Sequence, residues 1–235
     1  NSGTFIVTGY HAIEFMLWGQ DTEDPSELTA GNRPFSDYVD GTPFASRRRM
    51  YLDLVAEILI DDLQSVHDQW LPGANYRQSF ESNTNLALYN ILTGALDLSF
   101  AELGGERMEV ALDLAGLEGG FAAQEDEHSC FSDNTIADIL MNYKGIANVL
   151  NGTYTRINNG GTVSGVSVID VLAEINEADA NTLQAQVDEV TAQLGQINAP
   201  FDNALTTDVA DIRTSIDGLQ DLSFQLADAR ANFNQ

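Results

Sequence analysis

Apolar residues recur along most of the chain at spacings of three and four, which is the pattern of amphipathic helices. Strict alternation of apolar and polar residues, which would predict strands, is confined to short, scattered runs. The sequence therefore predicts an all-α fold of antiparallel helices packed in bundles. The expected long helices span residues 46–70, 86–103, 136–150, 167–197 and 207–233.

Capping and breaking residues indicate where these helices end. Ser46 is the expected N-cap of the first helix, and Asp133 or Asn134 that of the third, because their short side chains can accept hydrogen bonds from the first free backbone N–H groups. Gly104–Gly105 is expected to end or break the second helix, and Ala199–Pro200 to end the fourth.

Two stretches lack the helical pattern. Residues 20–44 carry Pro25, Pro34 and Pro43, and a loop of this length in a compact protein is usually either functional or disordered. Its aromatic residues and its arginine favour an ordered loop. Residues 151–167 are rich in Gly, Asn and Thr, and they predict a hairpin-like or loop connection.

Acidic residues dominate the charge of the chain. Its 235 residues include 36 Asp and Glu against 10 Lys and Arg, for a formal net charge of −26. Nucleic acid and anionic membrane surfaces are therefore poor partners, because proteins bind phosphates through positive charge. No stretch approaches the ~18 apolar residues of a spanning helix, so we expect no membrane-spanning segment. The single cysteine, Cys130, excludes an internal disulfide.

An imidazole and a carboxylate lie three residues apart in the apolar segment 9–21. On a helix His11 and Glu14 share a face, so both can reach one small ligand, most simply a cation. Two ligands do not complete a coordination shell, and a metal would need further groups from the chain or from water. The alternative is that the two side chains simply hydrogen-bond to each other. Bulky neighbours such as Phe15 and Trp18 predict that this helix is buried.

Residues 124–134 hold the second concentration of reactive side chains. On helical spacing Glu125, His128 and Ser132 share a face, which we expect to meet the face of the first pair. Glu127 adds a carboxylate that can serve as a ligand or a base. The alternative interpretation is a solvated acidic turn followed by a capping residue.

Four of the ten basic residues lie close to these motifs, namely Arg33, Arg48, Arg49 and Arg107. In so acidic a chain they can pair with nearby Asp and Glu and hold the long loop in place. They can equally present guanidinium groups to an anionic ligand or to a substrate carboxylate. The sequence leaves both interpretations open.

The segment Gly9–Glu14 resembles the G-x-H-x-x-E signature of the imelysin family, bacterial cell-envelope proteins also described as insulin-cleaving metallopeptidase-like or iron-regulated. The resemblance covers about residues 9–150, and beyond them it is one of helix pattern only. It also rests on residues 15–21, Gly31–Pro34, Arg47–Arg49, Gly105–Met108 and Glu125–Thr135.

This resemblance implies an all-α fold of two bundle-like domains with the signature at their junction. It also implies a secreted, periplasmic or outer-membrane-associated protein linked to iron acquisition. Residues 1–44 are then the signature helix and an ordered loop at the junction, and residues 45–235 are a helical bundle domain. Family members begin well before the signature, so we expect that a preceding N-terminal bundle is absent from this chain and is its packing partner.

Two classes of function follow from the motifs and the resemblance. The favoured one is a binding protein for a metal or a metal-bearing ligand, with iron or zinc as the expected divalent metal. The alternative is a metallopeptidase that acts on peptides, with Glu14 as its catalytic residue. A third possibility is a polar cluster that binds nothing. The expected metal ligands are His11, Glu14, Glu125 and His128, and the expected ligand-contacting residues are Arg33, Arg48, Arg49, Arg107, Glu127, Ser132 and Asp133.

Overall fold

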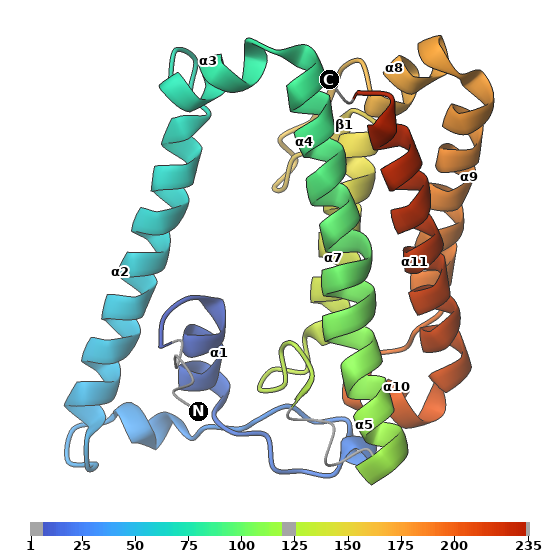
Figure 1. Ribbon diagram of the computed structural model, residues 1–235. Helices are drawn as coiled ribbons and strands as arrows, with labels where there is room; N and C mark the ends of the chain where they lie inside the picture. The colour runs from blue at the N-terminus through green and yellow to red at the C-terminus, as the bar shows by residue number, and fades with distance from the viewer. Residues whose placement is uncertain (1–6, 119–125, 234–235) are drawn as a thin grey trace, which may run out of the picture.

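The computed structural model describes residues 7–118 and 126–233, and most of their ordered elements are helices (Figure 1). The predicted all-α class is confirmed. Long helices lie side by side in a bundle, whereas the N-terminal helices lie outside it (Figure 1). The bundle consists of α4 (Thr84–Leu96), η3 (Asp97–Glu109), α5 (Val110–Glu118), α7 (Thr135–Leu150), α8 (Val168–Ile175), α9 (Glu177–Leu194), α10 (Phe201–Thr207) and α11 (Val209–Ala231).

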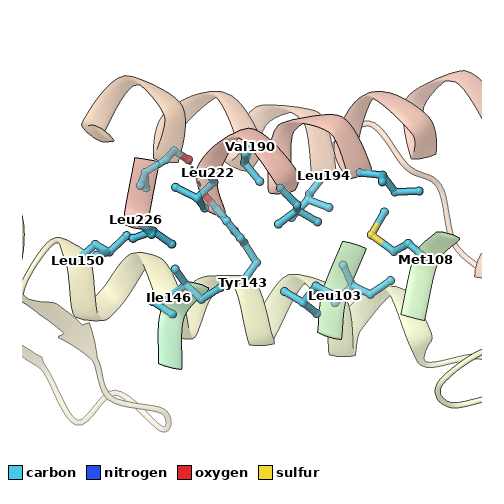
Figure 2. Close-up of a cluster of buried hydrophobic side chains, with 14 of the residues drawn as sticks. Leu103, Met108, Tyr143, Ile146, Leu150, Val190, Leu194, Leu222 and Leu226 are labelled. Carbon is cyan, nitrogen blue, oxygen red and sulfur yellow. Dashed lines mark hydrogen bonds between the residues drawn. The ribbon is translucent and has the colours of Figure 1, made fainter. Parts of the chain in front are cut away.

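The apolar stripes that the sequence predicts form the core of this bundle (Figure 2). Leu103, Leu150 and Leu226 are completely buried in it. Tyr143 of α7 is buried as well, and its hydroxyl donates a 2.6 Å hydrogen bond to the backbone carbonyl of Val187 in α9. The one polar atom of this side chain is therefore satisfied inside the core.

The continuous helical segment formed by α4, η3 and α5 packs against α7 and α11 in the bundle. By length and composition its segment Thr84–Asp113 is apolar enough to cross a membrane, a test that core helices also pass. Here its residues Leu92, Leu103 and Met108 are completely buried against the other helices of the bundle.

Gly104–Gly105 does not end this helix, so the predicted break is wrong. The backbone continues through the pair as the π-helical segment η3. At Gly104 an added Cβ would lie 3.0 Å from the Phe100 ring and 3.6 Å from the side chain of Leu219 in α11. The missing side chain thus makes room for the Phe100 ring of the same segment, whereas a Cβ would be in ordinary contact with α11. Local side-chain packing rather than helix termination accounts for this glycine.

The helix predicted over residues 167–197 is two helices. Ser167 and Asp170 form a capping box at the start of α8. Asn176 ends α8 in an extended conformation, and its side chain accepts hydrogen bonds from the first backbone N–H groups of α9. The prediction of one helix was wrong because this local cap outweighs a continuous apolar pattern.

A long helix, α2 (Ala45–Gln69), stands away from the bundle and is joined to it through α3 (Asn75–Glu81) (Figure 1). It begins directly after Phe44, which adopts a left-handed backbone conformation with φ 65°, and no side chain caps it. Ser46 is therefore not its N-cap, contrary to the prediction.

The apolar stripe of α2 is only partly covered. Val55 is buried, but Leu63 and Val66 are 49% and 60% exposed. The expectation of a core-facing helix is therefore wrong for the second half of α2, as far as the described residues show. This half of the helix presents an apolar face that the described residues do not cover.

The signature segment forms α1 (Tyr10–Trp18), which packs against α2. Glu14 is buried on it, whereas Phe15 and Trp18 are 37% and 39% exposed. Met16 is buried as well. The described residues thus leave parts of α1 uncovered, and the predicted burial all round is not found.

The two irregular stretches have the predicted character. The loop after α1 is ordered and contains the short turns η1 (Pro25–Glu27) and η2 (Phe35–Tyr38). The stretch between α7 and α8 holds a hairpin of β1 (Thr153–Thr155) and β2 (Thr162–Ser164), paired antiparallel.

Candidate functional site

The first turn of α1 brings together the two side chains of the signature. His11 Nδ1 and Glu14 Oε2 are 2.8 Å apart, as the spacing of three residues on a helix predicts. His11 is about half exposed, whereas the side chain of Glu14 is 10% exposed. The carboxylate is therefore the buried partner, and it holds the orientation of the imidazole ring.

Ser132 completes the hydrogen bonding of Glu14 from the other motif. Its backbone N–H and its hydroxyl both donate to Glu14 Oε1, at 3.0 and 2.6 Å. The described residues 126–134 form a turn rather than the expected helix, with Asp133 in a left-handed conformation at φ 53°. This turn, and not helical spacing, directs Ser132 toward α1.

His128 lies beside the first pair on the same turn. Its ring and that of His11 meet edge to face, with centroids 4.5 Å apart. Arg107 Nη1 donates a 2.8 Å hydrogen bond to His128 Nε2, because a guanidinium can only donate. The second terminal nitrogen of Arg107 lies 3.4 Å from a carboxylate oxygen of Glu102.

These contacts assign a protonation preference to each group. The hydrogen bond that His11 donates to Glu14 raises the pKa of His11 above 6.5, against the opposing effect of burial. Burial would raise the pKa of Glu14, but hydrogen bonds from His11 and Ser132 outweigh it and hold this pKa below 4.5. Burial, with the charge of Arg107 nearby, lowers the pKa of His128. The first pair thus favours imidazolium and carboxylate, and His128 favours neutral imidazole.

The four groups line a cavity of about 620 Å³. Tyr10 and Trp18 of α1 form part of its wall, and Asn142 and Asp138 of α7 form another part. Asp138 accepts hydrogen bonds from the Ser129 hydroxyl and, at 3.4 Å, from the side-chain amide of Asn134. A cavity with imidazole, guanidinium, amide and carboxylate groups suits a small polar ligand.

The cavity fits a bare metal ion poorly. Both oxygens of Glu14 already accept hydrogen bonds, and Nε2 of His128 faces a cation. Glu125, the fourth expected metal ligand, lies outside the described residues. Nε2 of His11 and Nδ1 of His128 have no hydrogen-bond partner among the described residues, and they are the two ring nitrogens of the cavity that a metal could use.

Three of the predicted ligand-contacting arginines lie in the long loop and its junction with α2 rather than in the cavity wall. Arg33 donates to Asp37 at 3.2 Å and to the backbone carbonyl of Phe15 at 3.1 Å. Arg48 donates to two loop carbonyls, and Arg49 pairs with a loop carboxylate at 2.6 Å. Their contacts are those of residues that hold the loop in place.

Two further predicted residues belong to a different cluster. Glu127 and Asp133 do not line the cavity, and a carboxylate oxygen of Asp133 lies within 4.8 Å of oxygens of Asp21 and Asp202. The sequence interpretation missed Asp21 and Asp202, as well as Asp138 in the cavity. No local pattern distinguishes these acids from the many others in the chain.

Comparisons with known proteins agree with this architecture. The sequence profile of imelysin, a peptidase M75 family, matches residues 4–229. Among solved structures, a candidate iron-regulated protein A precursor from Parabacteroides distasonis has a similar fold, with a TM-score of 0.78 at 20% identity. The match covers 97% of this chain but 64% of that one, so the chain spans about two thirds of the length of its structural neighbour. No match was found among curated proteins.

Proposed function

The chain belongs to the imelysin family, and on this basis we propose that it is a binding protein of iron uptake at the bacterial cell envelope. The observation that carries the proposal is the cavity between α1 and the turn before α7, where two imidazoles and a guanidinium meet a buried carboxylate. The similarity in fold to a protein described as iron-regulated supports the same class. A periplasmic, outer-membrane-associated or secreted location fits this role.

The ligand that fits the cavity best is a metal that arrives with donor atoms of its own. Both oxygens of Glu14 accept hydrogen bonds, and Arg107 places a positive charge beside His128, so both groups are poorly suited to bind a bare cation. A metal chelate with anionic groups could instead accept hydrogen bonds from Arg107. It would leave one coordination position for an imidazole.

His11 is the residue that we expect to reach the metal. Its Nδ1 is held by Glu14, which leaves Nε2 as the second ring nitrogen, and the imidazolium would release the Nε2 proton when the metal binds. A carboxylate that accepts from one nitrogen of an imidazole fixes the ring and makes the other nitrogen a better ligand. Glu14 therefore acts as a positioning residue, and Ser132 positions Glu14 in turn.

Titration of the full chain with ferric citrate, followed by the fluorescence of Trp18, tests this proposal, because Trp18 lies in the cavity wall. We expect His11→Gln to weaken binding at least tenfold. His67→Gln is the matched control, since His67 is exposed on α2 outside the cavity. Binding that survives unchanged in His11→Gln would overturn the proposal.

A metallopeptidase using the same residues is the alternative. Peptide hydrolysis needs an open metal position and a free general base beside the metal-bound water. The engagement of both Glu14 oxygens gives this alternative less support. Cleavage of a peptide by the purified chain that depends on added zinc and on Glu14 would reverse the preference.

We also propose that α1 and α2 pack against a further helical bundle in the whole protein. The exposed apolar residues of both helices support this proposal, because such faces are usually covered. Among them, Leu63 and Val66 of α2 and Trp18 of α1 are the most useful reporters.

A further inference from the structure

A second polar cluster lies outside the cavity, where the loop after α1 meets the turn before α7 and the start of α10. Asp21, Asp133 and Asp202 each place a carboxylate oxygen within 4.8 Å of those of the other two. Asp21 and Asp202 are only 4% and 2% exposed. Three carboxylates this close in a poorly solvated place repel one another unless protons or a cation separate them.

Glu127 provides an independent observation. It is 4% exposed, and neither of its carboxylate oxygens has a hydrogen-bond partner among the described residues. One oxygen of Asp133 is also buried without a partner, and none of the ion pairs of the described residues includes either acid. Buried carboxylates are nearly always satisfied, so unsatisfied ones indicate a group that completes them.

The electrostatics connect Glu127 to the other three acids. Burial is the main cause that raises the pKa of Glu127 to about 8, and the charges of Asp202, Asp133 and Asp21 contribute to this value against the opposing effect of the Thr135 hydroxyl. Burial and the same neighbours raise the pKa of Asp133 to about 7. Without a cation these two acids therefore hold protons near neutral pH, and a bound cation would have to displace them.

We propose that the cluster of Asp21, Asp133 and Asp202 binds a calcium ion, with the buried carboxylate of Glu127 in its surroundings. All three donors are carboxylates, which suit hard cations such as Ca²⁺ better than the softer metals that prefer imidazole or thiolate. Ca²⁺ binds oxygen at about 2.3–2.6 Å, so ligands on opposite sides of the ion lie up to about 5 Å apart. The three carboxylate oxygens all lie within 4.8 Å of one another, which is close enough for one such ion to reach all three.

The position of the site gives it a structural role. Asp21 follows the end of α1 by three residues, and Asp133 follows Ser132, which holds Glu14. A calcium ion here would tie the signature loop to the turn before α7 and to α10. It would thus stabilise both walls of the cavity without entering it.

Calcium titration of the full chain after treatment with a chelator tests the proposal, by calorimetry and by thermal unfolding. At a calcium concentration about 100-fold above Kd, we expect Tm to rise by about 5–10 °C. Asp133→Asn and Asp202→Asn should each weaken calcium binding at least tenfold. Asp221→Asn is the matched control, because Asp221 is exposed on α11 outside the cluster.

The outcomes separate a calcium site from a cluster that only shares protons. The metal-free Asp133→Asn variant should unfold at the wild-type temperature or above it, because the change removes repulsion, and it should not respond to calcium. No binding heat and no shift of Tm in the wild type would overturn the proposal, as would calcium binding that both Asn variants retain. Tighter binding of Zn²⁺ than of Ca²⁺ would overturn the assignment of the metal. If Asp202→Asn does not fold, calcium binding by the wild type and by Asp133→Asn tests the proposal.

Discussion

Ser132 donates hydrogen bonds to Glu14 through both its backbone N–H and its hydroxyl, at 3.0 and 2.6 Å, although 118 positions separate the two residues. This contact joins the signature helix to the turn before α7. As a result, two motifs that are far apart in the sequence line the same cavity. The stability and the chemistry of the site should therefore both depend on it.

Replacing Ser132 with Ala removes the hydroxyl hydrogen bond and leaves the backbone one. We expect the free energy of unfolding to fall by about 1–3 kcal/mol, because the acceptor is a buried carboxylate. Denaturation in urea measures this change. Ser46→Ala is the control, since Ser46 caps no helix, and should change stability by less than about 0.5 kcal/mol. An equal effect of both substitutions would show that the Ser132 hydroxyl contributes nothing specific.

The pair of His11 and Glu14 should give stability a characteristic pH dependence. The pKa of His11 is raised above 6.5 in the folded chain, so its contribution is complete below 6.5 and is lost as the pH rises through the raised value. The pKa of Glu14 is lowered below 4.5, so its contribution is present above 4.5 and is lost as the pH falls through the lowered value. The pair should therefore stabilise most between pH 4.5 and 6.5.

Unfolding of the wild type and of Glu14→Gln across the pH range measures this contribution. The difference in stability between them should be largest inside that window and should shrink on both sides. Other titrating groups are common to the two proteins, so most of their effects cancel. A difference that does not vary with pH would contradict a charged pair.

Arg107→Met should raise the pKa of His128. Burial is the main cause of its low value and would remain, but the repulsion by the guanidinium would be gone. NMR titration of the histidine resonances measures the change, and binding of ferric citrate should weaken in the same variant. Arg213→Met serves as the control, because Arg213 is exposed and lies 3.8 Å from an exposed Asp113. An unchanged titration of His128 would contradict the contact.

Arg33→Ala should destabilise the fold and leave ligand binding intact. The side chain of Arg33 is 13% exposed and donates to the loop and to α1, so its loss should cost about 1–3 kcal/mol. Denaturation in urea gives the stability, and the ferric citrate titration gives the affinity. Arg77→Ala removes an exposed ion pair and should cost less than about 1 kcal/mol. Lost binding in a stable Arg33→Ala protein would instead favour a ligand-contacting role.

The exposed apolar face of α2 should make the isolated chain bind a hydrophobic dye and associate. Leu63→Glu together with Val66→Glu should reduce both effects without loss of stability, because neither residue is buried. Ile157→Glu is the control, since Ile157 is 80% exposed in the hairpin away from α2. A wild-type chain that is monomeric and binds no dye would contradict the proposed packing of α1 and α2 against a further bundle.

Local patterns in the sequence were sufficient for the helical class, for several of the elements and for one half of the site. The stripes of α7 and α11 and the hairpin after α7 follow from periodicity and turn composition over a few residues. The same holds for His11 and Glu14, because a spacing of three on a helix places two side chains together whatever the rest of the chain does. Asn176 also carried a local signal, which the continuous apolar pattern around it concealed.

Only the tertiary structure decided what these elements meet. The sequence predicted a helix end at Gly104, whereas in the structure the backbone continues through it and the Phe100 ring lies against it. The path of the backbone over many helices brings Ser132 to Glu14 and Asp21 to Asp202. Short stretches of sequence do not reveal that path. The helical period determines which residues share a face, whereas the packing of whole helices determines which faces meet, and for this reason the site had to be found in three dimensions.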